Sequence, residues 1–181
     1  MGVASVKLYT SWDVRFYKDA AAVAQTVNSP NLSSLDLTAY DILWVGGGWG
    51  AAWDLAGSPA LINRATDRYA QGALMGSVCH GALGFVNATK ADGTPLVHGL
   101  NISAVSNRQL EELGIADLTP MHPETELERR GAIYQCKHGA ISDLTESLTV
   151  VDGAMVIGQN QNSACETAQR LLDQLAKRQA R

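Results

Sequence analysis

The chain has 181 residues, of which 46% are hydrophobic, and this is enough for one well-packed α/β domain, so we expect residues 1–181 to form a single domain. The net charge of −4 comes from interspersed acidic and basic residues. Without a basic stripe or a long apolar run, the sequence excludes nucleic acid and membranes as expected partners.

The chain contains the three cysteines Cys79, Cys136 and Cys165, at unrelated spacings. An odd number of cysteines argues against a disulfide framework and for a reducing compartment. The first residues also lack the layout of a signal peptide. We therefore expect a cytoplasmic protein.

The first half of the chain alternates between strand and helix patterns. Residues 41–45 form a short apolar run that meets Gly46-Gly47-Gly48, which predicts a buried strand followed by a tight turn. Apolar residues at helical spacing predict a helix over residues 59–71. Residues 73–78 predict the next buried strand, and residues 81–86 predict the start of a helix.

The second half continues this alternation with shorter elements. In chain order the pattern predicts a strand over residues 101–105, a helix over residues 108–113, a helical turn over residues 125–130 and a strand over residues 132–135. A hairpin is expected over residues 148–157, with Asp152-Gly153 as its turn. Strands that alternate with helices indicate a mostly parallel sheet covered on both faces, which is a three-layer α/β/α sandwich.

Residues 163–178 have the pattern of an amphipathic terminal helix. Ser163 is the expected N-cap of this helix. The expected buried stripe consists of Ala164, Ala168, Leu171, Leu172 and Leu175.

The segment from Gly76 to Ala82, with Cys79 at its centre, carries the clearest functional signal. A cysteine between a buried strand and a helix is typical of a nucleophile elbow, a sharp turn that exposes the sulfur at the carboxyl edge of a sheet. The backbone N–H groups that follow are expected to favour the thiolate. The local pattern leaves open a buried structural cysteine, because free cysteines are often buried in cores.

Four blocks of sequence point to a known family. In chain order they are Tyr40-Asp41 with Gly46 to Leu55, Val78-Cys79-His80-Gly81, Asp92 to Gly99, and Val151 to Ala164. Together they resemble the ThiJ/PfpI superfamily, a glutamine amidotransferase-like group with a flavodoxin-like fold. The most similar branch contains glyoxalase III and heat-shock chaperone proteins. The resemblance covers residues 13–178.

The resemblance implies roles for the residues around the elbow. Cys79 would be the nucleophile and His80 its partner. The amides of Gly47, Gly48 and His80 would bind the oxyanion, and Trp49 and Gly81 would complete the substrate pocket. The implied reaction converts methylglyoxal or another small α-oxoaldehyde into a 2-hydroxy acid, without a cofactor or a metal ion. A homodimer is also expected.

The N-terminal part departs from the family pattern. The family has a glutamate, on a helix after its first strand, that hydrogen-bonds the cysteine, whereas the first glutamate of this chain is Glu111. One interpretation is that this part of the pattern is missing. Another is that residues 3–10 stand in for the first strand and the glutamate helix is deleted. A partner chain is a third way to fill the strand position.

Further departures lie near the expected site. Trp49 stands where the family usually has histidine, Ala82 where it has proline, and Leu110 where it has a glutamate near the histidine. Asp13 and Glu111 are the remaining candidate acid partners. Without such a partner, general acid–base assistance worth roughly 10²–10⁴-fold in rate would be lost.

These departures support an alternative function, a thiol redox sensor or chaperone-like stress protein that oxidises at Cys79 without an acid–base partner. A third hypothesis is nucleotide binding, because residues 46–51 formally match the glycine-rich fingerprint G-x-G-x-x-A. We consider it weak, because Trp49 would crowd a pyrophosphate.

Other chemistry-bearing residues favour ordinary structural roles. Cys136-Lys137-His138 with His122 has metal-binding residue types, but a surface loop is the favoured interpretation. Trp44 is expected in the core and Trp49 at the cleft.

Overall fold

The computed structural model describes residues 11–180 and divides the chain into two units, Met1–Leu35 and Asp36–Arg181. The expected strand at residues 3–10 lies outside the described residues. A single domain over residues 1–181 stays a prediction.

The described part of the first unit is helical. It contains α1 (Ser11–Lys18), α2 (Ala20–Val27) and the 3₁₀ helix η2 (Leu32–Ser34). The Asp19 carboxylate accepts hydrogen bonds from the first N–H groups of α2, so it acts as the N-cap that this helix needs.

A four-stranded sheet with the order β1-β2-β6-β5 forms the centre of the second unit. Its strands are β1 (Ile42–Val45), β2 (Leu74–Val78), β5 (Thr149–Asp152) and β6 (Met155–Gly158). β1, β2 and β6 are parallel, and β5 is antiparallel to β6 in the predicted hairpin. The carboxyl ends of the three parallel strands therefore meet at one edge of the sheet.

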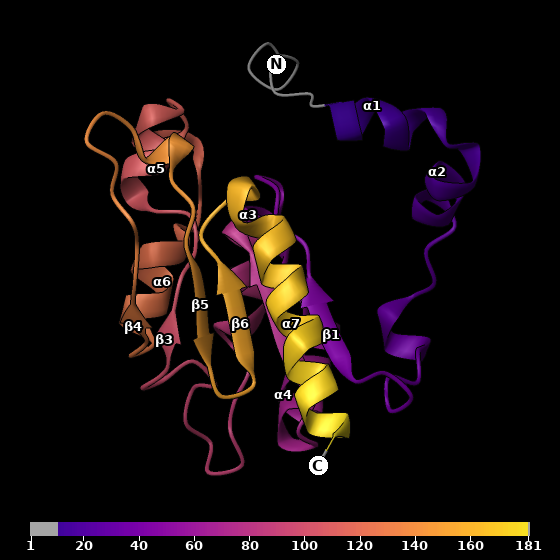
Figure 1. Cartoon of the computed structure of the whole chain (residues 1–181). Helices are drawn as coiled ribbons and strands as arrows, with labels where there is room; N and C mark the ends of the chain where they lie inside the picture. Colours follow the sequence, from indigo (N-terminus) through magenta and orange to yellow (C-terminus); the bar gives the residue numbers. More distant parts are fainter. Residues whose placement is uncertain (1–10, 181) are drawn as a thin grey trace. The chain divides into compact units, whose positions relative to one another are not determined.

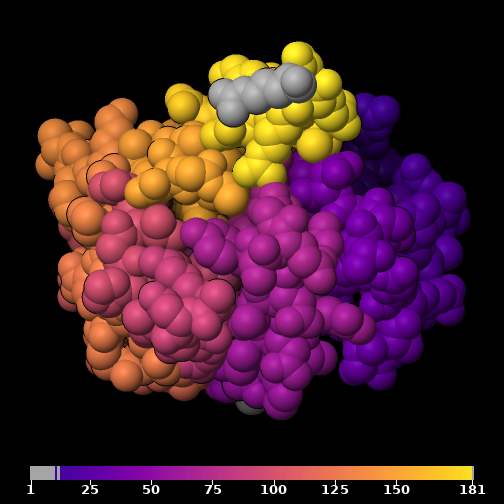
Figure 2. Space-filling view, turned by 90° about the horizontal axis from the view of Figure 1, so that it is seen from below, coloured from indigo at the N-terminus to yellow at the C-terminus, as the bar shows by residue number. Residues whose placement is uncertain are grey.

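Helices cover both faces of this sheet, as predicted (Figure 1). On one face, Leu171 of α7 (Ala164–Gln179) packs with Leu74 and Val156 in a fully buried cluster. On the other face lie α4 (Pro59–Ala70) and the 3₁₀ helix η3 (Cys79–Phe85). In the end-on view, α7 (yellow) lies above and the magenta segment that includes α4 lies below (Figure 2). The three-layer α/β/α sandwich is confirmed.

Shorter elements complete the second unit. These elements are α3 (Ala51–Asp54), β3 (Asn101–Ile102), α5 (Asn107–Glu112), η4 (Ala116–Leu118), α6 (Pro123–Arg129), β4 (Ile133–Tyr134), η5 (Asp143–Thr145) and η6 (Gln161–Ser163). β3 and β4 pair in parallel as a separate two-stranded sheet. Among the described residues, no helix combines the length and apolar character that a membrane span requires.

Ser163 is the N-cap residue of α7, as predicted, but its side chain makes no capping hydrogen bond, and its hydroxyl instead accepts one from the N–H of Leu148. The predicted buried stripe of this helix is wrong at two positions. Ala168 and Leu172 are exposed, and Thr167 and Leu171 are the buried residues of α7. The polar Thr167 is buried because its hydroxyl hydrogen-bonds the Ser163 carbonyl and Thr149.

Two predictions near the site also need correction. The helix expected at residues 81–86 is a 3₁₀ helix that begins at Cys79 itself. Trp44 is 38% exposed rather than buried, because its ring lies over Gly76 at an outer strand of the described sheet.

Candidate active site at the cysteine elbow

Cys79 lies directly after β2 in a strained backbone conformation. Its φ angle is +60°, and among the described residues it is the only residue other than glycine with a positive φ. A side chain with a Cβ atom pays about 1–2 kcal/mol for this left-handed conformation. The strand-to-helix turn predicted from the sequence is therefore present, and it is strained at the cysteine.

The backbone of the glycine loop that follows β1 packs directly against the backbone of this turn. A Cβ atom on Gly47 would lie 2.5 Å from the Val78 carbonyl oxygen and 3.0 Å from the Cys79 Cβ. A Cβ atom on Gly81 would collide with the carbonyl oxygens of Val45 and Gly46. Glycine is required at both positions because only backbone fits between the two turns.

The Cys79 sulfur lies among hydrogen-bonding groups. It is 3.4 Å from Nδ1 of His80, and the backbone N–H groups of His80 and Gly48 donate toward it. These amides are two of the three that the resemblance assigned to the oxyanion site.

The surroundings of Cys79 favour the neutral thiol rather than the thiolate that the sequence predicts. Burial raises the pKa of the Cys79 thiol above its ordinary value, although the amides of His80 and Gly48 oppose this shift. Burial, together with the charge of His122, lowers the pKa of His80 to about 4. At neutral pH the pair is therefore a thiol and a neutral imidazole.

No carboxylate of residues 36–180 hydrogen-bonds His80 to orient it. Its Nδ1 faces the sulfur, and its buried Nε2 has no hydrogen-bond partner among the described residues. If Nδ1 accepts the thiol proton, Nε2 carries the ring proton in the neutral form. Packing and the sulfur contact fix this ring, in place of the third member of a triad.

Glu111, one of the two candidate acid partners, makes no hydrogen bond with the Cys79 sulfur. Glu111 is exposed on α5, and Leu110 occupies the buried side of this helix. No carboxylate of residues 36–180 hydrogen-bonds Cys79 or His80. Asp13 belongs to α1 of the first unit, and its role stays a prediction.

Trp49 is held in place at the end of the glycine loop. Its indole N–H donates to the Thr119 hydroxyl at 2.9 Å, and its ring packs edge-to-face on Trp53 at 5.2 Å. It remains 40% exposed. Sequence reasoning missed Thr119, because a threonine 70 residues away carries no local signal for this contact.

The sequence grouped Cys136 and His138 with His122 as residues of metal-binding types, but the structure groups them differently. His122 hydrogen-bonds Asn107 and the Ala116 carbonyl and does not belong to the group that contains Cys136 and His138. Cys136 and His138 instead lie beside Asp143, and the three donor atoms are within 4.8 Å of one another.

We expect the stability of the fold to depend on His80 as the pH falls. The pKa of His80 is about 4 in the folded chain and 6.5 as its ordinary value, so between these values the unfolded chain binds more protons. The free energy of unfolding contributed by this residue is complete above pH 6.5 and is lost toward pH 4. The loss is up to about 3 kcal/mol, because one pKa unit corresponds to about 1.4 kcal/mol.

Urea unfolding at a series of pH values measures this dependence. His80→Gln should flatten the curve between pH 6.5 and 4, whereas the exposed His98→Gln should leave it unchanged. Equal acid slopes for His80→Gln and the unmodified chain would contradict a buried, neutral His80.

The fold and the elbow together define an α/β protein with a strained cysteine at the carboxyl edge of a parallel sheet. No family profile matches the chain. Glyoxalase 3 from Candida albicans is 30% identical over 150 residues, which cover 80% of this chain and 62% of that protein. The chain thus spans 54–67% of the length of the curated relatives that it matches.

Solved structures agree with this similarity. The crystal structure of glyoxalase III from Candida albicans matches with a TM-score of 0.81 at 27% identity, over 92% of this chain and 71% of that one. A ThiJ/PfpI domain protein from Brachyspira murdochii shares the fold alone, with a TM-score of 0.60 at 15% identity over 81% of this chain and 66% of that one. The chain belongs to the ThiJ/PfpI superfamily, in the branch that contains the glutathione-independent glyoxalases.

Proposed function

We propose that the chain converts methylglyoxal or a related small α-oxoaldehyde into a 2-hydroxy acid, without glutathione, through a covalent bond to Cys79. The observation that carries this proposal is the strained elbow, which holds the Cys79 sulfur 3.4 Å from the neutral His80 ring and beside two backbone N–H groups. The similarity to the Candida albicans glyoxalase supports the same reaction class.

In the first step the Cys79 sulfur adds to the aldehyde carbon and forms a hemithioacetal. Nδ1 of His80 accepts the thiol proton during the attack, because neither partner favours its charged form before the substrate arrives. The developing oxyanion accepts hydrogen bonds from the Gly48 and His80 amides, with Gly47 as a further donor. The proton then passes from His80 to this oxygen.

In the second step the hydrogen on the former aldehyde carbon moves as a proton to the neighbouring carbonyl carbon, through an enediol. The aldehyde carbon is thereby oxidised to a thioester and the ketone is reduced to an alcohol. Water then hydrolyses the thioester, releases the 2-hydroxy acid and restores the Cys79 thiol. His80 is the base for both proton transfers, because its Nδ1 lies 3.4 Å from the sulfur that holds the substrate.

The alternative functions have less support. Peroxide reacts with thiolates, and burial raises the pKa of the Cys79 thiol, which disfavours a redox sensor at this position. Nucleotide binding is disfavoured because the helix after the glycine loop, α3, has only four residues and offers a weak N-terminal dipole.

The experiment that tests the proposal is product formation by the purified chain. Incubation with methylglyoxal and no glutathione should yield lactate in proportion to protein concentration, and heat-denatured protein should yield none. Methylglyoxal consumption without lactate would instead indicate non-specific adducts on lysine and arginine, and would contradict the proposal.

We also propose that the chain forms a homodimer in the cytoplasm and acts on a small aldehyde rather than on nucleic acid or a membrane. All three cysteines are unpaired, which fits a reducing compartment. Among the described residues, β1 is an outer strand, which leaves one of its edges for pairing. Sedimentation velocity of the purified chain measures the oligomeric state.

A further inference from the structure

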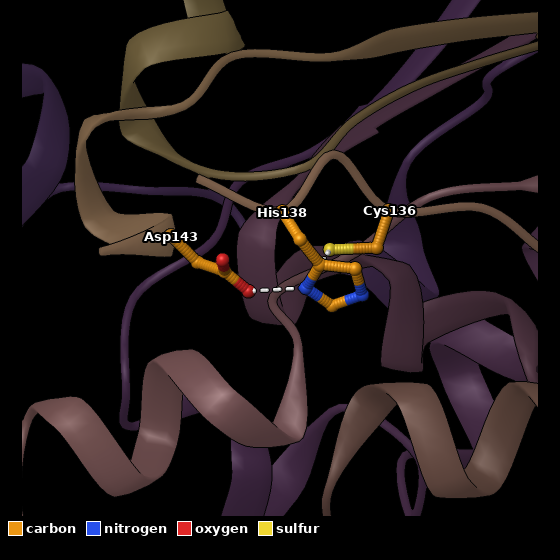
Figure 3. A group of neighbouring side chains, drawn as sticks. All are labelled: Cys136, His138 and Asp143. Atoms are coloured by element: carbon orange, nitrogen blue, oxygen red, sulfur yellow. Dashed lines mark hydrogen bonds and ion pairs between the residues drawn. The ribbon is translucent and has the colours of Figure 1, made fainter. Parts of the chain in front are cut away.

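A second cluster of reactive side chains lies outside the cysteine elbow. Cys136 and His138 follow β4, and Asp143 begins η5. Figure 3 shows the three side chains converging, with the carboxylate hydrogen-bonded to the imidazole. Their donor atoms lie within 4.8 Å of one another.

The geometry of the histidine distinguishes metal binding from nucleophilic catalysis. Nδ1 of His138 lies 2.7 Å from Oδ2 of Asp143 and 4.0 Å from the Cys136 sulfur. In a catalytic triad the acid and the nucleophile contact different ring nitrogens. Here one nitrogen faces both groups, which is the arrangement that chelation of a single ion requires.

Asp143 is held in place by hydrogen bonds and an ion pair to both of its carboxylate oxygens. Its side chain is fully buried, and Oδ1 accepts from the N–H of Gly139 at 3.0 Å and pairs with Arg108 at 3.3 Å. Oδ2 faces His138 and accepts from the Ser106 hydroxyl at 3.2 Å. Such outer hydrogen bonds orient the ligating oxygen and are typical of metal-binding carboxylates.

The cluster opens onto a cavity. This cavity has a volume of about 610 Å³, and Cys136, His138 and Tyr134 contribute to its lining. Glu124, Glu128 and Lys137 also line this cavity, so its lining has more acidic than basic side chains, which favours a cation. An ion bound by the three donors would have its remaining coordination position toward this space.

We propose that Cys136, His138 and Asp143 bind one Zn²⁺ ion through Sγ, Nδ1 and Oδ2, with the fourth position open to the cavity. Thiolate, imidazole and carboxylate together favour Zn²⁺ over Mg²⁺ or Ca²⁺, which prefer oxygen ligands. Ligands of tetrahedral zinc lie roughly 3.3–3.8 Å apart, so the donors need to shift by less than about 1 Å. Binding releases the thiol proton and moves the ring proton of His138 to Nε2.

Cobalt(II) is the probe for this site, because it occupies zinc sites and reports thiolate ligation by charge-transfer absorption in the near ultraviolet. The chelator-treated chain should bind one equivalent of Co²⁺ with this absorption, and Zn²⁺ should displace it. Cys79→Ser and Cys165→Ser should keep the absorption, whereas Cys136→Ser should lose it. A wild-type spectrum without the band, or a band that survives Cys136→Ser, would overturn the proposal.

Zinc affinity from competition with a chromophoric chelator gives a second measure. Cys136→Ser and His138→Gln should each weaken binding by more than about tenfold, since loss of an outer-shell partner alone costs about 10–100-fold. Both residues lie on the cavity side and are partly exposed, so these variants should fold. Unchanged affinity in either variant would exclude that residue as a ligand and overturn the proposed set.

Discussion

Replacing Cys79 with alanine is expected to reduce lactate formation from methylglyoxal by at least roughly 10³-fold. The thiol is the atom that bonds to substrate in the proposed reaction, and removal of a covalent nucleophile leaves only binding and the oxyanion donors. The measurement is kcat/KM for lactate formation, with circular dichroism to show that the variant is folded.

Two matched variants separate chemistry from structure at this position. Cys165→Ala, on the exposed side of α7, should retain full activity. Cys79→Gly should be as inactive as Cys79→Ala but more stable by about 1 kcal/mol, because glycine adopts φ +60° without the penalty that a Cβ atom carries. Substantial lactate formation by Cys79→Ala would exclude the covalent route, and equal stabilities would show that the elbow is not strained.

Replacing Gly47 with alanine is expected to lower the free energy of unfolding by about 1–3 kcal/mol, the usual cost of forcing extra atoms into a packed contact. The new Cβ atom would lie 2.5 Å from the Val78 carbonyl oxygen, so either the glycine loop or the elbow must move. This shift separates the Gly48 amide from the Cys79 sulfur. We therefore expect kcat for lactate formation to fall as well.

Gly46→Ala is the control for this substitution. A Cβ atom on Gly46 meets nothing within 4 Å, and its φ is not in the left-handed region. This variant should be as stable as the unmodified chain or slightly more stable, since alanine restricts the unfolded state. Thermal unfolding of both variants tests the comparison, and similar losses at the two positions would contradict the close packing of Gly47 on the elbow.

Local sequence patterns were sufficient for the layers of the fold. The apolar runs that became β1, β2 and β6, and the helical spacing in α4, specify buried strands and an amphipathic helix through their own periodicity. The 3₁₀ form of η3 and the exposure of Trp44 were not predictable, because they depend on neighbours that are distant in sequence.

The candidate site shows the same division. The glycines on either side of the elbow are visible in the sequence because only small residues permit the turn, and the strained turn at Cys79 lies where they predict it. The predicted thiolate at Cys79 was wrong, because the N–H groups near the sulfur are local but the burial that outweighs them is a property of the whole fold.

The sequence by itself determined the alternating α/β architecture, the cysteine elbow and the family, because periodicity, glycine placement and motif order are local properties of the chain. Only the tertiary structure decided that the Cys79–His80 pair is neutral and that no carboxylate of residues 36–180 hydrogen-bonds it. It also decided that Cys136 and His138 meet Asp143 rather than His122. These outcomes depend on desolvation and on contacts between distant segments, which exist only once the layers have packed.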